Sequence, residues 1–251
     1  MNCLGFVAAP LWMLGYVDQA LKRSHEAFTL VQELSHAYTR TRALVYAAML
    51  YGLRREWSTA QERAEAALAI TTEQGFGHSV GVVTFLRGEA LAAQGQGEAG
   101  IAQMHQGLIA IRATGQGVAL SAYLAMLARA YSNSGRAEEG LRLLTEALVH
   151  VDHTGERFWE AEVYRLKGEL LQTIPDALQA EACFQRALVM ARRQQAKSWE
   201  LRVAMSLSRL WQQQGKRAAA HDLLAPIYGW FTEGFDTADL QEARALLQEL
   251  T

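Results

Sequence analysis

The sequence contains few of the residues that mark several familiar protein classes. Its 251 residues include three prolines and two cysteines, Cys3 and Cys183. Two isolated thiols exclude a disulfide framework, and neither thiol has the spacing of a metal-binding cysteine motif. The scarcity of proline and the lack of strand-type alternation argue against an all-β fold. We therefore predict a chain that keeps its thiols reduced in the cytoplasm.

An excess of basic charge is also lacking. The chain has 24 Lys and Arg against 26 Asp and Glu, a net charge of −2, which does not suit the neutralisation of a phosphate backbone. The longest uncharged stretch, residues 1–17, is shorter than the roughly 20 apolar residues that cross a bilayer. It also lacks the basic start of a secretory signal. We predict neither nucleic acid nor a membrane as a partner.

This uncharged stretch is expected to form the first helix of the chain, with Leu4, Val7, Leu11 and Trp12 on its packing face. A terminal helix of a repeat protein ordinarily needs a polar outer face, yet the first charged residue is Asp18. The pattern predicts that the chain is a piece of a longer multidomain protein. It also predicts self-association through this helix.

Small residues recur six times at intervals of forty residues. Three positions of the repeat carry them, and the members of the three columns are Ala8, Ala48, Gly88, Ala128, Gly168 and Ser208; Ala20, Ala60, Gly100, Gly140, Ala180 and Ala220; and Ala27, Ala67, Gly107, Ala147 and Ala187, with Ile227 departing. A fixed period of 20 to 50 residues is typical of a solenoid, and small residues allow helices to cross closely. The columns therefore predict stacked helical hairpins.

The predicted fold is all-α: a right-handed α-α superhelix of about six 40-residue hairpins in a single domain, residues 1–251. We expect helices at 78–94, 97–114, 118–134 and 137–153, and a capping helix within 236–251. The arrangement resembles the tetratricopeptide repeat, whose usual period is about 34 residues, and a HEAT-like stack is the alternative.

A glycine column separates the two helices of most hairpins. Its members are Gly15, Gly95, Gly135 and Gly215, while Arg55 and Pro175 replace glycine in the other two hairpins. Glycine adopts the left-handed conformation of a helix cap most easily. The turns at Arg55 and Pro175 are therefore expected to differ.

Two short motifs suggest chemistry but fit the repeat better. Gly95, Gly97 and Gly100 spell G-x-G-x-x-G, which binds dinucleotides only after a strand; here a helix is expected before it. His150 and His153 lack a third metal ligand in the pattern. We predict no cofactor, no metal and no enzymatic activity, with an enzyme of unrecognised site as the least favoured alternative.

The first helix of each hairpin is expected to line the inner surface of the superhelix and to contact a protein or peptide partner. The residues predicted to form this partner-binding groove are Arg42, Val45, Met49, Val82, Phe85, Glu89, Arg129, Asn133, Glu162, Arg165, Glu169, Arg202, Met205 and Arg209. Its first half is apolar and its second half charged. Glu89, Arg129, Glu169 and Arg209 alternate in sign and are expected to pair between repeats. Trp159 and Trp199 share a column and are expected to pack between repeats.

Three stretches resemble a known family: GERFWEAEVYRLKGELL (155–171), AKSWELRVAMSLSRLWQQQGKR (196–217) and LLAPIYGWFTEGFDTADLQEARALLQEL (223–250). They are similar to the C-terminal tetratricopeptide region of bacterial predicted ATPases, often fused to class III adenylate or guanylate cyclase domains. The resemblance implies an interaction scaffold that acts as a regulatory or sensor arm, with the upstream ATPase or cyclase domains as partners. The alternative is a sensor domain that holds a small-molecule effector in the superhelix cavity.

Overall fold

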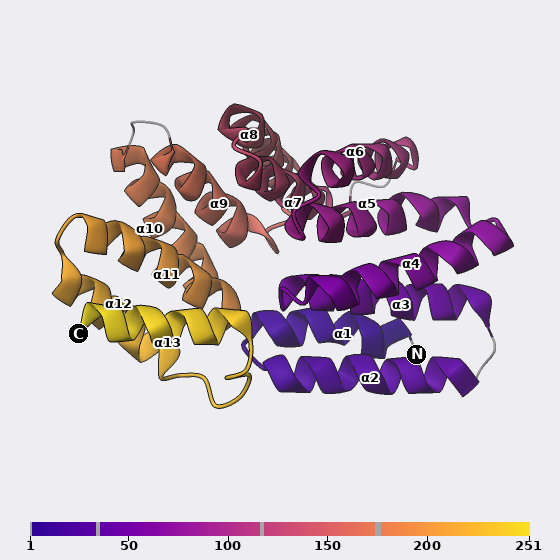
Figure 1. Ribbon diagram of the computed structural model, residues 1–251, viewed down its shortest axis with the longest axis horizontal. Helices are drawn as coiled ribbons and strands as arrows, with labels where there is room; N and C mark the ends of the chain where they lie inside the picture. The colour runs from indigo at the N-terminus through magenta and orange to yellow at the C-terminus, as the bar shows by residue number, and fades with distance from the viewer. Residues whose placement is uncertain (1, 34–35, 116–117, 174–176) are drawn as a thin grey trace. The chain divides into compact units, whose positions relative to one another are not determined.

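The computed structural model describes residues 2–33, 36–115, 118–173 and 177–251. Over these ranges the chain forms thirteen helices and no strand (Figure 1). The predicted helices at 78–94, 97–114, 118–134 and 137–153 agree to within two residues with α5 (Gly77–Ala93), α6 (Gly97–Ala113), α7 (Leu120–Asn133) and α8 (Ala137–Thr154). The prediction of an all-α, tetratricopeptide-like solenoid of helical hairpins is confirmed.

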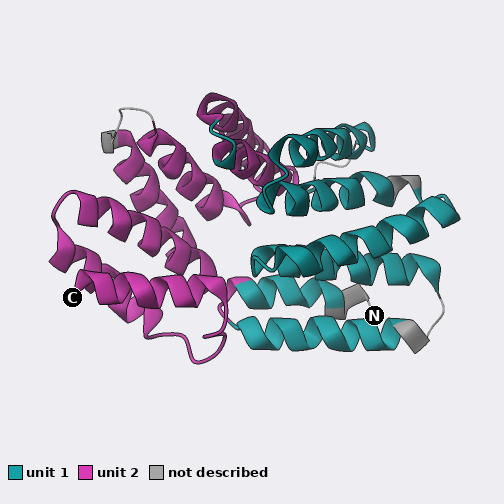
Figure 2. Cartoon of the chain, in the orientation of Figure 1, with its two compact units in different colours: residues 1–12, 16–118, 133–135 teal, residues 13–15, 119–132, 136–251 magenta. Residues whose placement is uncertain are grey.

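The chain divides into two compact units (Figure 2). Unit 1 comprises Met1–Trp12, Tyr16–Val118 and Asn133–Gly135; unit 2 comprises Met13–Gly15, Ala119–Ser132 and Arg136–Thr251. Each unit has its own apolar core. A single domain over residues 1–251 stays a prediction.

Unit 1 contains the first three hairpins. Their helices are α1 (Asn2–Met13), α2 (Val17–Glu33), α3 (Ala37–Leu53), α4 (Trp57–Gln74), α5 and α6. Consecutive helices from α2 to α6 pack against one another, and the first helices α3 and α5 also touch. Leu44, Val83 and Leu86 are buried in the core between these helices.

Unit 2 contains the remaining hairpins and a final helix. Its helices are α7, α8, α9 (Glu160–Gln172), α10 (Ala177–Arg193), α11 (Lys197–Gln213), α12 (Arg217–Tyr228) and α13 (Ala238–Leu250). The first helices α9 and α11 touch, and α11 touches α13. Leu240, Ala243, Leu246 and Leu250 of α13 are buried, as the capping-helix prediction requires.

Every residue of the three small columns is buried. The spacing is tightest between α5 and α6, where a Cβ added to Gly100 would lie 2.5 Å from the Gly88 carbonyl oxygen. One added to Gly107 would lie 2.6 Å from the Gly81 carbonyl oxygen. The columns are therefore the points where two helical backbones come close, as the repeat predicted.

The turns between helices use the left-handed backbone conformation. Gly15, Gly95, Gly135 and Gly215 have φ of 94°, 90°, 72° and 77°. Arg55 keeps the same conformation with φ 65°, so the prediction that its turn differs is wrong: the hairpin geometry imposes the left-handed turn even on a residue with a Cβ. Pro175 lies outside the described residues.

The buried face of helix α1 differs from the packing face predicted from the sequence. Trp12 is buried as expected, but Val7 is 40% exposed and Phe6 60% exposed, so assigning Val7 to the packing face is wrong. The Leu4 side chain lies outside the described part of the chain. Among the described residues, no helix combines the length and hydrophobicity needed to cross a bilayer.

Candidate partner-binding surface

In unit 1, the predicted groove residues lie on α3 and α5 and are largely part of the core. Val45, Met49 and Val82 belong to one apolar cluster, in which Met49 and Val82 are partly exposed. Phe85 is completely buried. Its prediction as an exposed anchor is therefore wrong, because the helix face that carries it packs inside the protein.

Two further groove residues have opposite surroundings. Glu89 is 6% exposed, and its carboxylate lies beside Gly52 of α3. Asn133 is exposed and, with Ser134, lines a hollow together with the turn between α5 and α6. Only Asn133 of this pair offers its side chain freely to solvent.

Arg42 begins the row of candidate residues on α3. Its guanidinium stacks over the Tyr46 ring, 4.8 Å from the ring centroid, and its Nη2 donates a hydrogen bond to the Tyr46 hydroxyl. The i, i+4 spacing places both side chains on one face of the helix. Phe6 of α1 meets the same Tyr46 ring edge to face, with centroids 6.1 Å apart.

In unit 2, the predicted residues form a buried network of ion pairs. Arg165 donates from Nε and Nη2 to the two carboxylate oxygens of Glu162, at 2.6 and 2.8 Å. It also donates from Nη1 to Glu169. Ser206 of α11 donates to the Glu169 carboxylate at 2.8 Å, which links the two first helices.

The network continues to the last helix through Arg202. Its Nε donates to the Asp239 carboxylate at 2.7 Å, and its Nη1 lies 3.9 Å from the Glu162 carboxylate. Buried guanidinium and carboxylate groups are stable only when paired in this way. The network therefore ties α9, α11 and α13 together.

The electrostatics of Glu162 follow from its neighbours. Burial alone would raise the pKa of this carboxyl group, but the guanidinium groups of Arg165, Arg202 and Arg129 outweigh burial and hold the pKa below its ordinary value. Burial acts to lower the pKa of Arg165, and the carboxylates of Glu162 and Glu169 raise it above the ordinary value. Both groups are charged at neutral pH, which suits a fixed electrostatic surface more than proton transfer.

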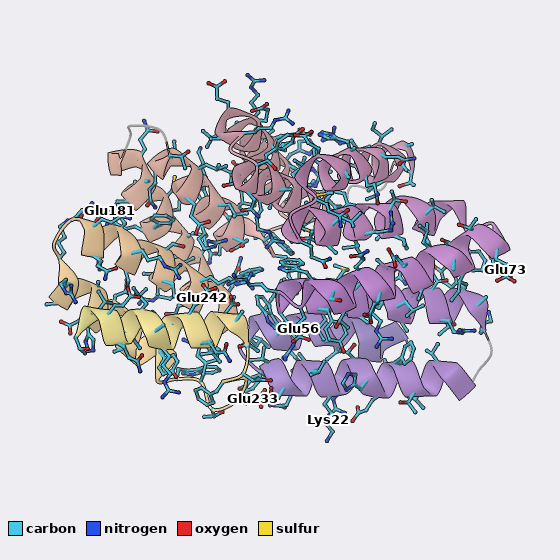
Figure 3. The ribbon with its side chains drawn as sticks, in the orientation of Figure 1. Lys22, Glu56, Glu73, Glu181, Glu233 and Glu242 are labelled. Atoms are coloured by element: carbon cyan, nitrogen blue, oxygen red, sulfur yellow. The ribbon has the colours of Figure 1, made fainter. Side chains whose placement is uncertain are left out.

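The predicted pairing of Glu169 with Arg209 is wrong, and the pairing of Glu89 with Arg129 stays a prediction. Glu169 pairs with Arg165 and Ser206, whereas Arg209 pairs with Glu242 of α13 at 3.2 Å. Figure 3 shows Glu242 on α13. Some contacts between repeats join residues 37 apart, as in Arg202 and Asp239, or 33 apart, as in Arg209 and Glu242. Others keep the repeat spacing, as in Glu162 and Arg202, which are 40 apart. A side chain of one first helix thus reaches partners in the next one at the repeat spacing and also about one or two helical turns away from it.

Three members of this surface were not predicted from the sequence: Ser206, Asp239 and Glu242. The signal for Glu242 was present, because Glu162, Arg202 and Glu242 form a 40-residue column that alternates in sign. Asp239 and Ser206 had no such signal, since each lies 37 residues from its partner and not at the repeat spacing.

The two tryptophans at the start of α9 and α11 pack together as predicted. Trp159 and Trp199 are buried, with ring centroids 5.1 Å apart. The glutamates that follow them are buried in ion pairs: Arg157 binds Glu160 at 2.9 Å, and Lys197 binds Glu200 at 2.7 Å. These aromatic rings belong to the core and are not a ligand platform.

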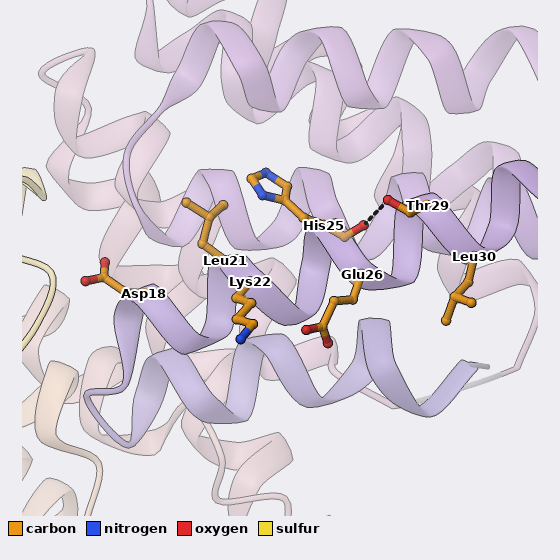
Figure 4. Close-up of a pocket in the computed structure, with 7 residues that line it drawn as sticks. All are labelled: Asp18, Leu21, Lys22, His25, Glu26, Thr29 and Leu30. Atoms are coloured by element: carbon orange, nitrogen blue, oxygen red, sulfur yellow. Dashed lines mark hydrogen bonds between the residues drawn. The ribbon is translucent and has the colours of Figure 1, made fainter.

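A separate hollow lies along α2 (Figure 4). Its volume is about 740 Å³, and Asp18, Leu21, Lys22, His25, Glu26, Thr29 and Leu30 line it. Lys22 and Glu26 project from the same side of the helix, and His25 from another, where its Nε2 lies 3.1 Å from the Tyr51 hydroxyl. A hollow open to solvent and lined by one helix lacks the enclosure of a small-molecule site.

Two motifs remain, the glycine-rich stretch at residues 95–100 and the histidine pair His150 and His153. The G-x-G-x-x-G stretch follows α5 and enters α6, so no strand precedes it. The described residues contain no group of three His, Cys, Asp or Glu side chains placed to hold a metal ion.

No family model matches this sequence, and no curated protein matches it. Solved structures do. NprR in complex with its cognate peptide NprX has a TM-score of 0.71 at 14% identity, covering 98% of this chain and 70% of NprR. A Rap protein complexed with competence and sporulation factor has a TM-score of 0.71 at 12% identity, covering 98% of this chain and 73% of Rap.

A third similar structure is a signal transduction ATPase with numerous domains and a tetratricopeptide repeat sensor, from Pyrococcus horikoshii. Its TM-score is 0.60 at 13% identity, over 98% of this chain and 38% of that protein. At these identities the comparisons establish the fold alone: a tetratricopeptide-like helical repeat.

Proposed function

We propose that this chain is a scaffold that binds a protein or peptide on its first helices. The observation that carries the proposal is the row of charged side chains at the edge of the unit 2 network. The side chains of Glu169, Arg209 and Glu242 are 37%, 44% and 38% exposed while their ion pairs hold them in place. Side chains fixed before binding lose little conformational entropy when a partner arrives.

We keep the partner-binding groove predicted from the sequence as the proposed site, and we divide its residues into two groups. Arg42, Met49, Val82, Arg129, Asn133, Glu169 and Arg209 contact the partner. The more deeply buried Val45, Phe85, Glu89, Glu162, Arg165, Arg202 and Met205 position the helices and side chains beneath them.

The structural comparisons support a peptide partner and a regulatory setting. NprR was solved with its cognate peptide NprX and a Rap protein with competence and sporulation factor, and the Pyrococcus ATPase carries a tetratricopeptide repeat sensor. We propose a cytoplasmic regulatory or sensor arm of a bacterial signalling ATPase or nucleotide cyclase, with the ATPase or cyclase domains as partners. A small-molecule effector is less favoured, because the α2 hollow is open.

A displayed random-peptide library tests the binding proposal. The wild-type chain should enrich a set of peptides, and Arg209→Ala should weaken their binding about tenfold or more. Arg142→Ala is the matched control, because Arg142 is an exposed arginine of the second helix α8, paired with Glu138. Failure to enrich any peptide, or equal loss with both variants, would contradict the proposal.

A further inference from the structure

Arg42 differs from the arginines of the later first helices. Arg165 and Arg202 each bind carboxylates. Arg42 has no carboxylate within ion-pair distance among the described residues, and its hydrogen bond goes to the neutral Tyr46 hydroxyl. Its Nε is buried without a hydrogen-bond partner in the described part of the chain.

Within the described residues, this arrangement leaves the positive charge of Arg42 without a carboxylate and its Nε without an acceptor. A buried donor without an acceptor destabilises a protein, and more strongly when it is charged. Hydrogen bonds between guanidinium and carboxylate are among the strongest in proteins, because both partners are charged. A ligand carboxylate that reaches the guanidinium would therefore balance its charge.

The surroundings of Arg42 are apolar. Phe6 packs against the Tyr46 ring and is largely exposed. Met49, two turns further along α3, is partly exposed in the cluster that contains Val82 of α5. A ligand that reaches Arg42 thus places its neighbouring groups against aromatic and aliphatic side chains.

We propose that Arg42 binds a peptide carboxylate that lies next to an apolar side chain. This inference rests on the proposed peptide-binding function and names its ligand class. The carboxylate belongs to the peptide C-terminus or to an Asp or Glu side chain, since both have the same chemistry. The net charge of −2 favours one carboxylate over a polyanion such as a nucleic acid.

Two peptide pools separate the sources of the carboxylate. One pool has random sequences without Asp or Glu and a free C-terminus; the other contains Asp and Glu but is amidated at the C-terminus. A third pool, amidated and without Asp or Glu, has no carboxylate. Affinity selection by the 251-residue chain should enrich peptides from one of the first two pools at least tenfold over the third.

Three variants test the role of Arg42. Arg42→Gln should abolish this enrichment, and Arg42→Lys should retain part of it, because lysine keeps the charge but loses the planar fork. Arg40→Gln is the control: it removes an exposed positive charge from the same helix and should change nothing. Thermal melting of each variant verifies that it is folded.

The outcomes distinguish this inference from the function on which it rests. Equal enrichment from all three pools, or unchanged selection by Arg42→Gln, overturns the carboxylate assignment while peptide binding stands. The absence of enrichment from every pool overturns both. Loss of selection by Arg40→Gln to the same extent as Arg42→Gln also contradicts a specific role for Arg42.

Discussion

At the residue scale, Gly100 and Gly140 occupy the same repeat position but face different neighbours. A Cβ at Gly100 meets the backbone of Gly88 and Ala92 at 2.5 Å, whereas one at Gly140 first meets the flexible end of Leu170, at 2.8 Å. Gly100→Ala should destabilise the protein by about 1–3 kcal/mol through overpacking. Gly140→Ala should leave the free energy of unfolding nearly unchanged, because alanine is also about 1 kcal/mol more favourable than glycine in a helix. Urea denaturation measures both; equal losses would show that backbone proximity is not the deciding factor.

Gln195 has a left-handed backbone, φ 56°, at the position where Gly75, Gly115 and Gly155 end other hairpins. A residue with a Cβ is strained in this conformation by about 1–2 kcal/mol. Gln195→Gly should therefore raise the free energy of unfolding by about 0.5–1 kcal/mol, because the greater freedom of glycine in the unfolded chain offsets part of the gain. Gln195→Ala, which keeps the strain, is the control; a similar increase for both would point to loss of the side chain as the cause.

At the scale of the elements, the Arg202 and Asp239 pair attaches α13 to α11. Asp239→Asn should lower the free energy of unfolding by about 3–5 kcal/mol, because it removes the charge that balances the buried guanidinium of Arg202. The double variant Arg202→Met with Asp239→Leu should recover most of that loss by apolar packing. Thermal unfolding tests this recovery. A double variant as unstable as the single one would mean that the pair contributes more than charge balance.

On the scale of the whole molecule, acid should destabilise the protein. The folded pKa of Glu162 is below its ordinary value of 4.5, so below that pH the unfolded chain takes up a proton that the folded chain does not. The stabilisation is fully present above pH 4.5 and is lost as the pH falls through the lower folded pKa. Hydrogen bonds from Gln61 and Arg87 lower the pKa of Glu65 and act in the same direction.

Urea midpoints measured between about pH 7 and pH 3 check this dependence. Glu162→Gln should show a shallower decline, since its side chain cannot titrate. A midpoint independent of pH in the wild-type chain would contradict the role assigned to the network.

Self-association through α1 is a second prediction for the whole molecule. Phe6 and Val7 are exposed on a helix in which no described residue is charged. Phe6→Ser with Val7→Ser should abolish any concentration-dependent increase in mass measured by light scattering. Trp12 is not suitable for this test, because it is buried and its replacement would disturb folding. A wild-type mass that does not change with concentration would contradict the prediction.

Much of the fold follows from sequence periodicity. The forty-residue columns place small residues where backbones cross, and the glycines mark the turns, so the hairpins and their helix bounds were predictable. The Trp159 and Trp199 contact was predictable for the same reason. The charged residues of unit 2 were also identified, because their column positions place them on first helices.

The partners of those charges were decided by the tertiary structure alone. Sequence spacing fixes which face of a helix a residue occupies, but not the offset along the axis between neighbouring helices. That offset pairs Arg209 with Glu242 and Ser206 with Glu169, and packing buries Phe85. The chain sequence determined the repeat, its helices and its turns; only the stagger and packing of the helices determined which side chains remain exposed to meet a partner.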